Sequence, residues 1–170
     1  MSDLKATIDI LRHGGIVAYP TVAVYGLGCD PCNETAVLRL LENKQRPLEK
    51  GLILIAAEVA QLEMFIEPSV FGQYPEVVAS WPGPNTWLLP CKADTPFWLK
   101  GIHDTLAVRV TAHSLSAALC RDFGRPLVST SANPNHIAVP GQAYSFGIVK
   151  AAQARGDFDV LAERGRRLLR

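Results

Sequence analysis

The stretch Asn33–Ala57, NETAVLRLLENKQRPLEKGLILIAA, contains a helix, a basic turn and a buried strand in direct succession. Asn33 is a favourable N-cap, and Glu34 suits the first turn of a helix. The apolar residues that follow recur at the spacing of one helical face: Val37, Leu40 and Leu41. The apolar run 51–57 is typical of a strand buried on both faces. The stretch therefore predicts one helix–strand unit of an α/β fold.

The same alternation continues on both sides of this unit. Further helices are expected at 3–13, 58–65, 69–79 and 114–123, and further strands at 16–20, 86–90, 106–110 and 126–130. A chain of 170 residues has room for one domain with a sizeable core. Alternating elements therefore predict a single α/β domain over 1–170, with a mostly parallel or mixed sheet flanked by helices. In such sheets ligands bind in loops beyond the strand ends.

Composition and charge exclude several classes of function. The formal net charge is +1, so no global excess of charge attracts nucleic acids or membranes. The N-terminal stretch MSDLKATIDILRHGG carries acidic residues within its apolar spacing, unlike a secretory signal. The longest apolar run is far shorter than the roughly 20 residues that cross a bilayer. We therefore expect a cytoplasmic protein with no membrane partner.

Cysteine and histidine give no metal pattern. The pair Cys29 and Cys32 forms one C-x-x-C, which is compatible with a redox pair or half a zinc site, but Cys91 and Cys120 are isolated. Free cytosolic thiols are the simpler interpretation. The four histidines have no ligand spacing, and no P-loop or nucleophile motif is present. No metal ligand and no catalytic nucleophile are predicted.

The first candidate loop, YPTVAVYGLGCD at residues 19–30, follows the expected strand at 16–20. Thr21 lies just past the strand, and Tyr25 precedes a Gly-Leu-Gly triplet. Glycines let a ligand approach the backbone, and a hydroxyl can orient a polar group. The alternative is a glycine turn without a ligand.

The second candidate loop, NKQRPLEKG at residues 43–51, places Lys44, Arg46 and Lys50 just before the buried strand. Three cations at one strand end can hold a triphosphate, since arginine binds phosphate bidentately and lysine acts as a point charge. The alternative is a solvated charged face in which lysine complements the helix C-terminus.

The third candidate loop, LVSTSANPN at residues 127–135, carries Ser129, Ser131 and Asn133 after a strand. Such residues can line a phosphate or carboxylate site, or form an ordinary turn.

In the strand LAVRV, Arg109 shares one face with Thr111. A strand arginine is costly without a partner, so it contacts either phosphate or an internal carboxylate. Cations and hydroxyls without a nucleophile suit nucleotidyl transfer by positioning and charge neutralisation.

Five segments occur together in one order: YPTVAVYGLGCD, KQRPLEKGLILIAA, WPGPNTWLLP, LAVRV and PLVSTSAN. In sequence and spacing they resemble the YrdC-type family of threonylcarbamoyl-AMP synthases. The resemblance covers about residues 6–133, and the part at 134–170 diverges. It implies a twisted sheet with a large, concave, positively charged cavity, in which the Pro-Gly-Pro corner is architectural and Thr86 faces the pocket.

The resemblance also implies an activity. A nucleotidyltransferase would convert L-threonine, bicarbonate and ATP, with Mg²⁺, into threonylcarbamoyl-adenylate and pyrophosphate. The product would serve N6-threonylcarbamoyladenosine formation in tRNA, so tRNA or the threonylcarbamoyl-transferase complex is an expected partner. By similarity, threonine and bicarbonate would be bound by Thr21, Tyr25, Lys50 and Thr111. ATP would be bound by Lys44, Arg46, Arg109, Ser129, Ser131 and Asn133.

Two departures from the family pattern leave alternatives open. Val22 stands where the family usually has glutamate, and PNHIAVPG replaces the expected Ser-Gly turn after Asn133. The C-terminal residues are basic: Arg164, Arg166, Arg167 and Arg170. One alternative is therefore a non-catalytic RNA- or nucleotide-binding protein, and another is an enzyme that uses a different acyl or carbamoyl substrate.

Overall fold

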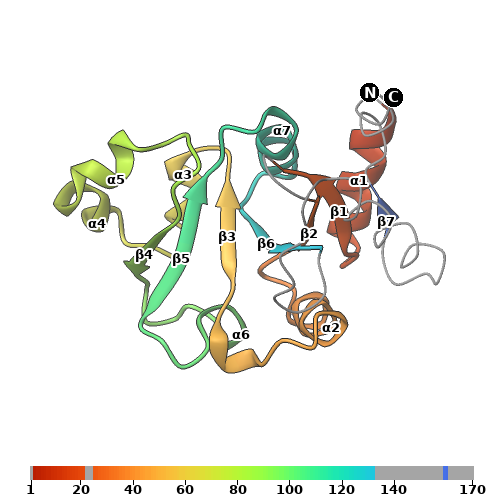
Figure 1. Ribbon diagram of the computed structural model, residues 1–170, viewed down its shortest axis with the longest axis horizontal. Coiled ribbons are helices and arrows are strands. Elements are labelled where there is room, and N and C mark those ends of the chain that lie inside the picture. Colours follow the sequence, from red (N-terminus) through yellow and green to blue (C-terminus); the bar gives the residue numbers. More distant parts are fainter. Residues whose placement is uncertain (1, 22–24, 133–158, 161–170) are drawn as a thin grey trace.

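The computed structural model describes residues 2–21, 25–132 and 159–160, through which a seven-stranded mixed sheet runs (Figure 1). The strands are β1 Val17–Pro20, β2 Tyr25–Cys29, β3 Ile53–Ala56, β4 Trp87–Pro90, β5 Thr105–Val110, β6 Leu127–Ser131 and β7 Asp159–Val160. The helices are α1 Ser2–Arg12, α2 Glu34–Asn43, α3 Val59–Leu62, α4 Pro68–Gln73, α5 Pro75–Ala79, α6 Phe97–Lys100 and α7 Ser114–Phe123, with the 3-10 turn η1 Leu48–Lys50.

The strand order is β4-β5-β3-β6-β2-β1-β7. The pairs β3–β5 and β1–β7 are parallel, whereas the other four pairs of described strands are antiparallel. The mixed α/β fold is confirmed, with antiparallel pairing more frequent than strand–helix alternation suggested. The reason is β6, which enters between β3 and β2 and runs antiparallel to both (Figure 1).

Local capping residues set the helix boundaries. The Asn33 side chain accepts a 3.0 Å hydrogen bond from the Ala36 N–H, which confirms it as the N-cap of α2. Helix α7 ends at Gly124, which adopts the left-handed conformation with φ 86°. The expected helices at 58–65 and 69–79 are instead the three short helices α3, α4 and α5. Proline opens two of them, since Pro68 and Pro75 begin new helices rather than continue an old one.

Strand β2 was expected to be a glycine-rich loop, and that expectation was wrong. The segment pairs with β1 on one side and β6 on the other. A Cβ atom at Gly28 would lie 2.8 Å from Cε1 of Tyr19, and one at Gly26 would lie 3.3 Å from Cε2 of the same ring. The two glycines therefore let the Tyr19 ring lie against the strand.

Two apolar clusters cover the two faces of the sheet unequally. The larger one packs α2 to α6 against one face and includes Leu40, Leu54 and Val108. The smaller one packs α1 and α7 against the other face and includes Leu11, Ile55 and Leu119. Figure 1 shows α1 and α7 gathered at the β1 side of the sheet. Helices therefore cover only part of the second face, and we call the uncovered part the open face.

Among the described helices, none has the length and apolar character that crossing a bilayer requires.

Candidate functional site

The strand register aligns side chains along the open face. Directly paired residues point to the same side of a sheet. The pairings give one row across five strands: Leu88, Ala107, Ile53, Ser129 and Gly28. Leu88 is 71% exposed, whereas Ala107, Ile53 and Ser129 are half-buried. Gly28 is buried beneath the Tyr19 ring, whereas the side chains of Leu88, Ala107, Ile53 and Ser129 are at least partly exposed and are available to a ligand.

Lys44 joins the second and third predicted loops. Its ammonium group donates a 2.7 Å hydrogen bond to the backbone carbonyl of Ser131. Ser131 pairs with Gly26, and a Cβ atom at Gly26 would lie 3.1 Å from the Thr21 methyl carbon. The three loops predicted from the sequence therefore converge at this end of the open face. Burial, and secondly the charge of Arg46, lower the pKa of Lys44, which an anion placed between the two cations would reverse.

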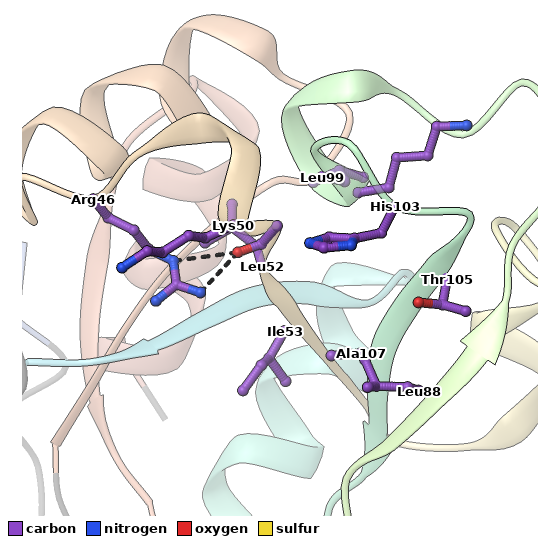
Figure 2. Close-up of a pocket in the computed structure, with 11 residues that line it drawn as sticks. Arg46, Lys50, Leu52, Ile53, Leu88, Leu99, His103, Thr105 and Ala107 are labelled. Atoms are coloured by element: carbon purple, nitrogen blue, oxygen red, sulfur yellow. Dashed lines mark hydrogen bonds between the residues drawn. The ribbon is translucent and has the colours of Figure 1, made fainter.

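Arg46 and Lys50 line a pocket of about 240 Å³ on the same face (Figure 2). The Arg46 guanidinium donates two hydrogen bonds to the Gly51 carbonyl, 2.9 Å from Nη2 and 3.2 Å from Nε. The pocket also has two further basic side chains, Lys100 and His103. Its apolar lining is Leu52, Ile53, Leu88, Leu99 and Ala107. The pocket is basic as expected, while the large cavity implied by the resemblance stays a prediction.

Arg109 extends the basic character to the β5 side of the open face. Its Nε donates a 2.8 Å hydrogen bond to the hydroxyl of Thr86, and Nη2 contacts the same oxygen. Among the described residues no carboxylate pairs with Arg109, so the ion-pair alternative has no support there. The rigid corner before β4 fixes Thr86, since the Gly83 N–H donates to the Val110 carbonyl at 2.9 Å. The corner thus positions the residue that holds Arg109.

Two of the predicted site residues, Tyr25 and Thr111, are buried. Tyr25 starts β2 with its side chain in the core cluster on the opposite face, and burial raises its pKa. Thr111 is buried, and its hydroxyl accepts the His113 N–H at 3.2 Å. Asn133 and Val22 lie outside the described residues. The basic C-terminal arginines lie outside them as well.

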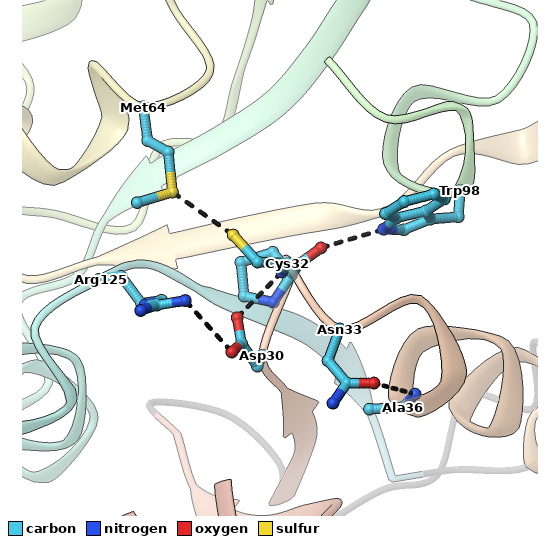
Figure 3. Close-up of polar contacts among 8 residues, drawn as sticks. Asp30, Cys32, Asn33, Ala36, Met64, Trp98 and Arg125 are labelled. Atoms are coloured by element: carbon cyan, nitrogen blue, oxygen red, sulfur yellow. Dashed lines mark hydrogen bonds and ion pairs between the residues drawn. The ribbon is translucent and has the colours of Figure 1, made fainter. Parts of the chain in front are cut away.

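The turn between β2 and α2 is held by contacts from distant segments (Figure 3). The Asp30 carboxylate accepts the Cys32 N–H at 2.9 Å and forms a 3.3 Å ion pair with Arg125. The Trp98 indole donates a 3.0 Å hydrogen bond to the Pro31 carbonyl. These contacts fix the start of α2, whose other end carries Lys44.

The four cysteines are free, and burial raises the pKa of Cys29 to about 12, so that thiol is unreactive.

The basic loop has a backbone support behind it. The Leu52 N–H donates a 2.8 Å hydrogen bond to the Leu99 carbonyl at the end of α6. Gly101 has φ 62°, and a Cβ atom there would lie 2.3 Å from the Glu49 carbonyl oxygen. Helix α6 thus packs tightly against η1, which carries Lys50. This packing fixes the position of η1, and with it the position of Lys50, relative to the open face.

Sequence reasoning missed several lining residues. Leu88 and Ala107 lie within the segments WPGPNTWLLP and LAVRV but were not singled out there, and Thr105 and His103 lie outside the quoted segments. Only the register of β4, β5 and β3 brings them together, and that register depends on pairings between distant residues.

Among the described residues, no group of three or more His, Cys, Asp or Glu side chains could hold a metal ion.

Sequence comparisons identify relatives of this chain. The family model for Sua5, YciO and YrdC proteins, described as telomere recombination, matches residues 9–146. A Methylococcus capsulatus protein named threonylcarbamoyl-AMP synthase is 58% identical over 130 residues, covering 76% of this chain and 70% of that protein. A Xanthomonas campestris pv. campestris protein of the same name is 54% identical over 133 residues, covering 77% of this chain and 71% of the other.

A solved structure has the same fold. Sua5 of P. abyssi, determined in complex with L-threonine, superimposes with a TM-score of 0.79 at 32% sequence identity. The match covers 92% of this chain and 45% of the longer Sua5 chain, so this chain spans less than half of that protein. The family model and the curated relatives each cover most of the described residues. The chain belongs to the Sua5/YciO/YrdC family.

Proposed function

We propose that this chain is a threonylcarbamoyl-AMP synthase, a nucleotidyltransferase that converts L-threonine, bicarbonate and ATP into threonylcarbamoyl-adenylate and pyrophosphate. The observation that carries the proposal is the contact between Lys44 and the Ser131 carbonyl, with Thr21 and Arg46 beside it. This arrangement gathers cations and hydroxyls on one open face. The relatives named for this activity, at 54% and 58% identity, support the same assignment.

The geometry suits a reaction without a protein nucleophile. Threonine and bicarbonate would first form a carbamate, with loss of water. A carbamate oxygen then attacks the α-phosphorus of ATP, the new P–O bond forms, and the bond to the pyrophosphate oxygen breaks. Lys44, Arg46 and Arg109 would offset the negative charge that grows on the phosphate oxygens. Ser129, Ser131 and Asn133 complete the proposed nucleotide contacts.

Threonine would be held by Thr21 and Lys50, with the buried Thr111 as a further member of the proposed set. The Tyr25 side chain lies in the core on the opposite face and would not contact threonine. Mg²⁺ neutralises phosphate charge when it is bound with ATP. The described residues offer no cluster of carboxylates or histidines for it, so the phosphates and water would hold most of its coordination sphere. We place the reaction in the cytoplasm, where ATP and tRNA occur, with tRNA or the transferase complex as the recipient of the adenylate.

The decisive test incubates the full chain with ATP, labelled bicarbonate, L-threonine and Mg²⁺, and follows both adenylate and pyrophosphate. Pyrophosphate release that depends on threonine is the expected result. Lys44→Ala and Arg46→Ala should each lower it about 100-fold or more, since each removes a charge beside the phosphates. Arg121→Ala, an exposed cation on α7, serves as the matched control and should change nothing.

ATP binding without any release of pyrophosphate at high protein concentration would overturn the synthase assignment. That result would instead favour the non-catalytic nucleotide-binding protein. Release that is supported by another amino acid, but not by threonine, would favour an enzyme for a different carbamoyl substrate.

A further inference from the structure

Helix α7 contacts the segment that carries Thr21 from the covered part of the sheet. Ser116 lies in the first turn of this helix, and its hydroxyl donates a 3.1 Å hydrogen bond to the backbone carbonyl of Pro20, 96 residues earlier in the chain. Ser116 is only 1% exposed. A buried hydroxyl is costly without a partner, and this one bonds to a distant carbonyl rather than to water. The contact therefore joins α7 to the end of β1, where the first predicted loop begins.

Ser116 is itself held by the turn that leads into α7. The His113 Nδ1 atom lies 3.0 Å from Ser116 Oγ and accepts the Ser116 N–H at 3.3 Å. The His113 N–H donates to the Thr111 hydroxyl at 3.2 Å, and the Thr111 N–H donates to the Ala56 carbonyl at 3.0 Å. Because Ala56 is the last residue of β3, these contacts anchor the donor that holds Pro20 to the centre of the sheet.

A bond to the Pro20 carbonyl acts directly on Thr21. The carbonyl of one residue and the N–H of the next belong to one planar peptide unit, so holding the oxygen also fixes the direction of the Thr21 N–H. The Thr21 methyl carbon lies 3.1 Å from the place that a Cβ atom at Gly26 would take. Thr21 is therefore limited in its backbone by Ser116 and in its side chain by the bare backbone of β2.

The cations of the open face have other supports. Helix α6 packs against η1, which carries Lys50, and the Thr86 hydroxyl holds Arg109. Lys44 donates to the carbonyl of Ser131. Loss of the Ser116 hydroxyl should therefore disturb Thr21 and leave the phosphate-facing cations in place.

We propose that Ser116 is a positioning residue for the binding of threonine, and that it acts on Thr21 through the Pro20 carbonyl. This inference rests on the proposed function, in which Thr21 holds the amino acid substrate. It gives a role in substrate binding to a helix residue that belongs to none of the five segments quoted from the sequence. Without the hydroxyl, the peptide between Pro20 and Thr21 can rotate, and Thr21 is less often in the position that threonine requires.

The test compares binding of L-threonine with binding of ATP, each measured separately by calorimetry on the full chain. Ser116→Ala removes the hydroxyl and introduces a residue that favours the helix. We expect threonine affinity to fall about fivefold, because one binding group is no longer held in place, and ATP affinity to change less than about twofold. Ser116→Cys offers a weaker donor of similar size, so its threonine affinity should lie between those of the wild type and Ser116→Ala.

The matched control is Ser114→Ala, which removes an exposed hydroxyl from the same turn of α7 and should leave both affinities unchanged. Urea unfolding of the variants measures the effect on stability separately. A purely structural contribution of Ser116 would lower the stability and leave the affinity of the folded chain for threonine unaltered. Unchanged threonine affinity in Ser116→Ala, or equal losses for threonine and ATP, would refute the positioning role.

The outcomes separate this inference from the proposed function. A wild-type chain that binds threonine with help from Ser116 but releases no pyrophosphate would retain the positioning role and refute the synthase. An active synthase whose KM for threonine is the same in Ser116→Ala would retain the function and refute the positioning role. A wild-type chain that binds no threonine would also refute the positioning role, because Thr21 would then have no amino acid to hold.

Discussion

The hydroxyl of Tyr19 donates a 2.9 Å hydrogen bond to the hydroxyl oxygen of Ser129, 110 residues later in the chain. The bond crosses β2, because Tyr19 lies on β1 and Ser129 on β6, and the glycines of β2 leave room for the ring between them. Burial raises the pKa of Tyr19, so the phenol stays protonated and acts as the donor. A residue of the proposed ATP site is thus oriented by a core side chain.

Tyr19→Phe should lower the free energy of unfolding by about 1 kcal/mol, since one buried hydrogen bond is lost while the ring packing remains. Urea denaturation monitored by circular dichroism would measure the change. Tyr74→Phe is the control, because Tyr74 is 41% exposed and should tolerate loss of its hydroxyl. Equal stability of the two variants would show that the bond to Ser129 contributes nothing.

Thr86→Val should reduce kcat/KM of the proposed synthase about tenfold without unfolding the protein. The Thr86 hydroxyl holds the Arg109 guanidinium, and its loss lets the cation leave the position where phosphate charge develops. Arg109→Ala should cost more, about 100-fold, because the charge itself disappears. Steady-state pyrophosphate release measures both, with the exposed Thr35→Val as control. A Thr86→Val enzyme as active as the wild type would mean that Arg109 needs no such support.

Gly101→Ala should destabilise the protein by about 1–3 kcal/mol and weaken the binding of threonine by the proposed synthase. The new Cβ would strike the Glu49 carbonyl, and positive φ adds backbone strain, so η1 and Lys50 must shift. The matched control is Gly72→Ala in α4, where a Cβ meets nothing within 4 Å. That change should be neutral or stabilising by about 0.5–1 kcal/mol. Thermal unfolding of the two variants in opposite directions is the expected pattern, and similar shifts would contradict it.

The cap of α7 predicts a pH dependence of stability. His113 Nδ1 accepts the Ser116 N–H at 3.3 Å, and the Ser116 hydroxyl donates to the Pro20 carbonyl at 3.1 Å. Burial lowers the pKa of His113 from its ordinary value of 6.5, because the folded site disfavours the charged ring. The unfolded chain then binds the proton more readily. The His113 contribution to stability is full above pH 6.5 and is lost as the pH falls through the folded pKa.

His113→Asn should reduce this acid-dependent loss, since asparagine caps a helix without titrating in this range. Urea unfolding at about pH 5 and about pH 7.5, for the variant and the wild type, measures the difference. The gap between the two pH values should be smaller in the variant. A gap of the same size would show that His113 does not contribute to it.

The elements that local rules decide could be predicted from the sequence. The α2 cap at Asn33 and the buried strand β3 depend on residues adjacent in the chain, and both were found where expected. Strand β2 was missed because glycine disfavours strands by local propensity. What overrides that propensity is the ring of Tyr19, which needs the space that a side chain would fill. That requirement is visible only after the strands are paired.

Some residues of the candidate site could also be predicted from the sequence, and others could not. Lys44, Arg46 and Ser131 could be named from their motifs, and the contact between Lys44 and Ser131 supports their grouping. Leu88 and His103 are ordinary residues, and their place in the pocket follows from strand register and the loop before β5. Tyr25 was expected among polar contacts, but alternation along β2 turns its side chain into the core.

The position of β6 has a consequence for synthesis on the ribosome. Among the described strands, β1 and β2 form one ribbon and β3, β5 and β4 form another, and β6 joins them. A nascent chain that has emerged only as far as Pro126 carries both ribbons with unpaired inner edges, which favour aggregation. The two ribbons therefore join only after β6 has emerged from the ribosome, and the growing polypeptide acquires the surface that spans both of them in that one step.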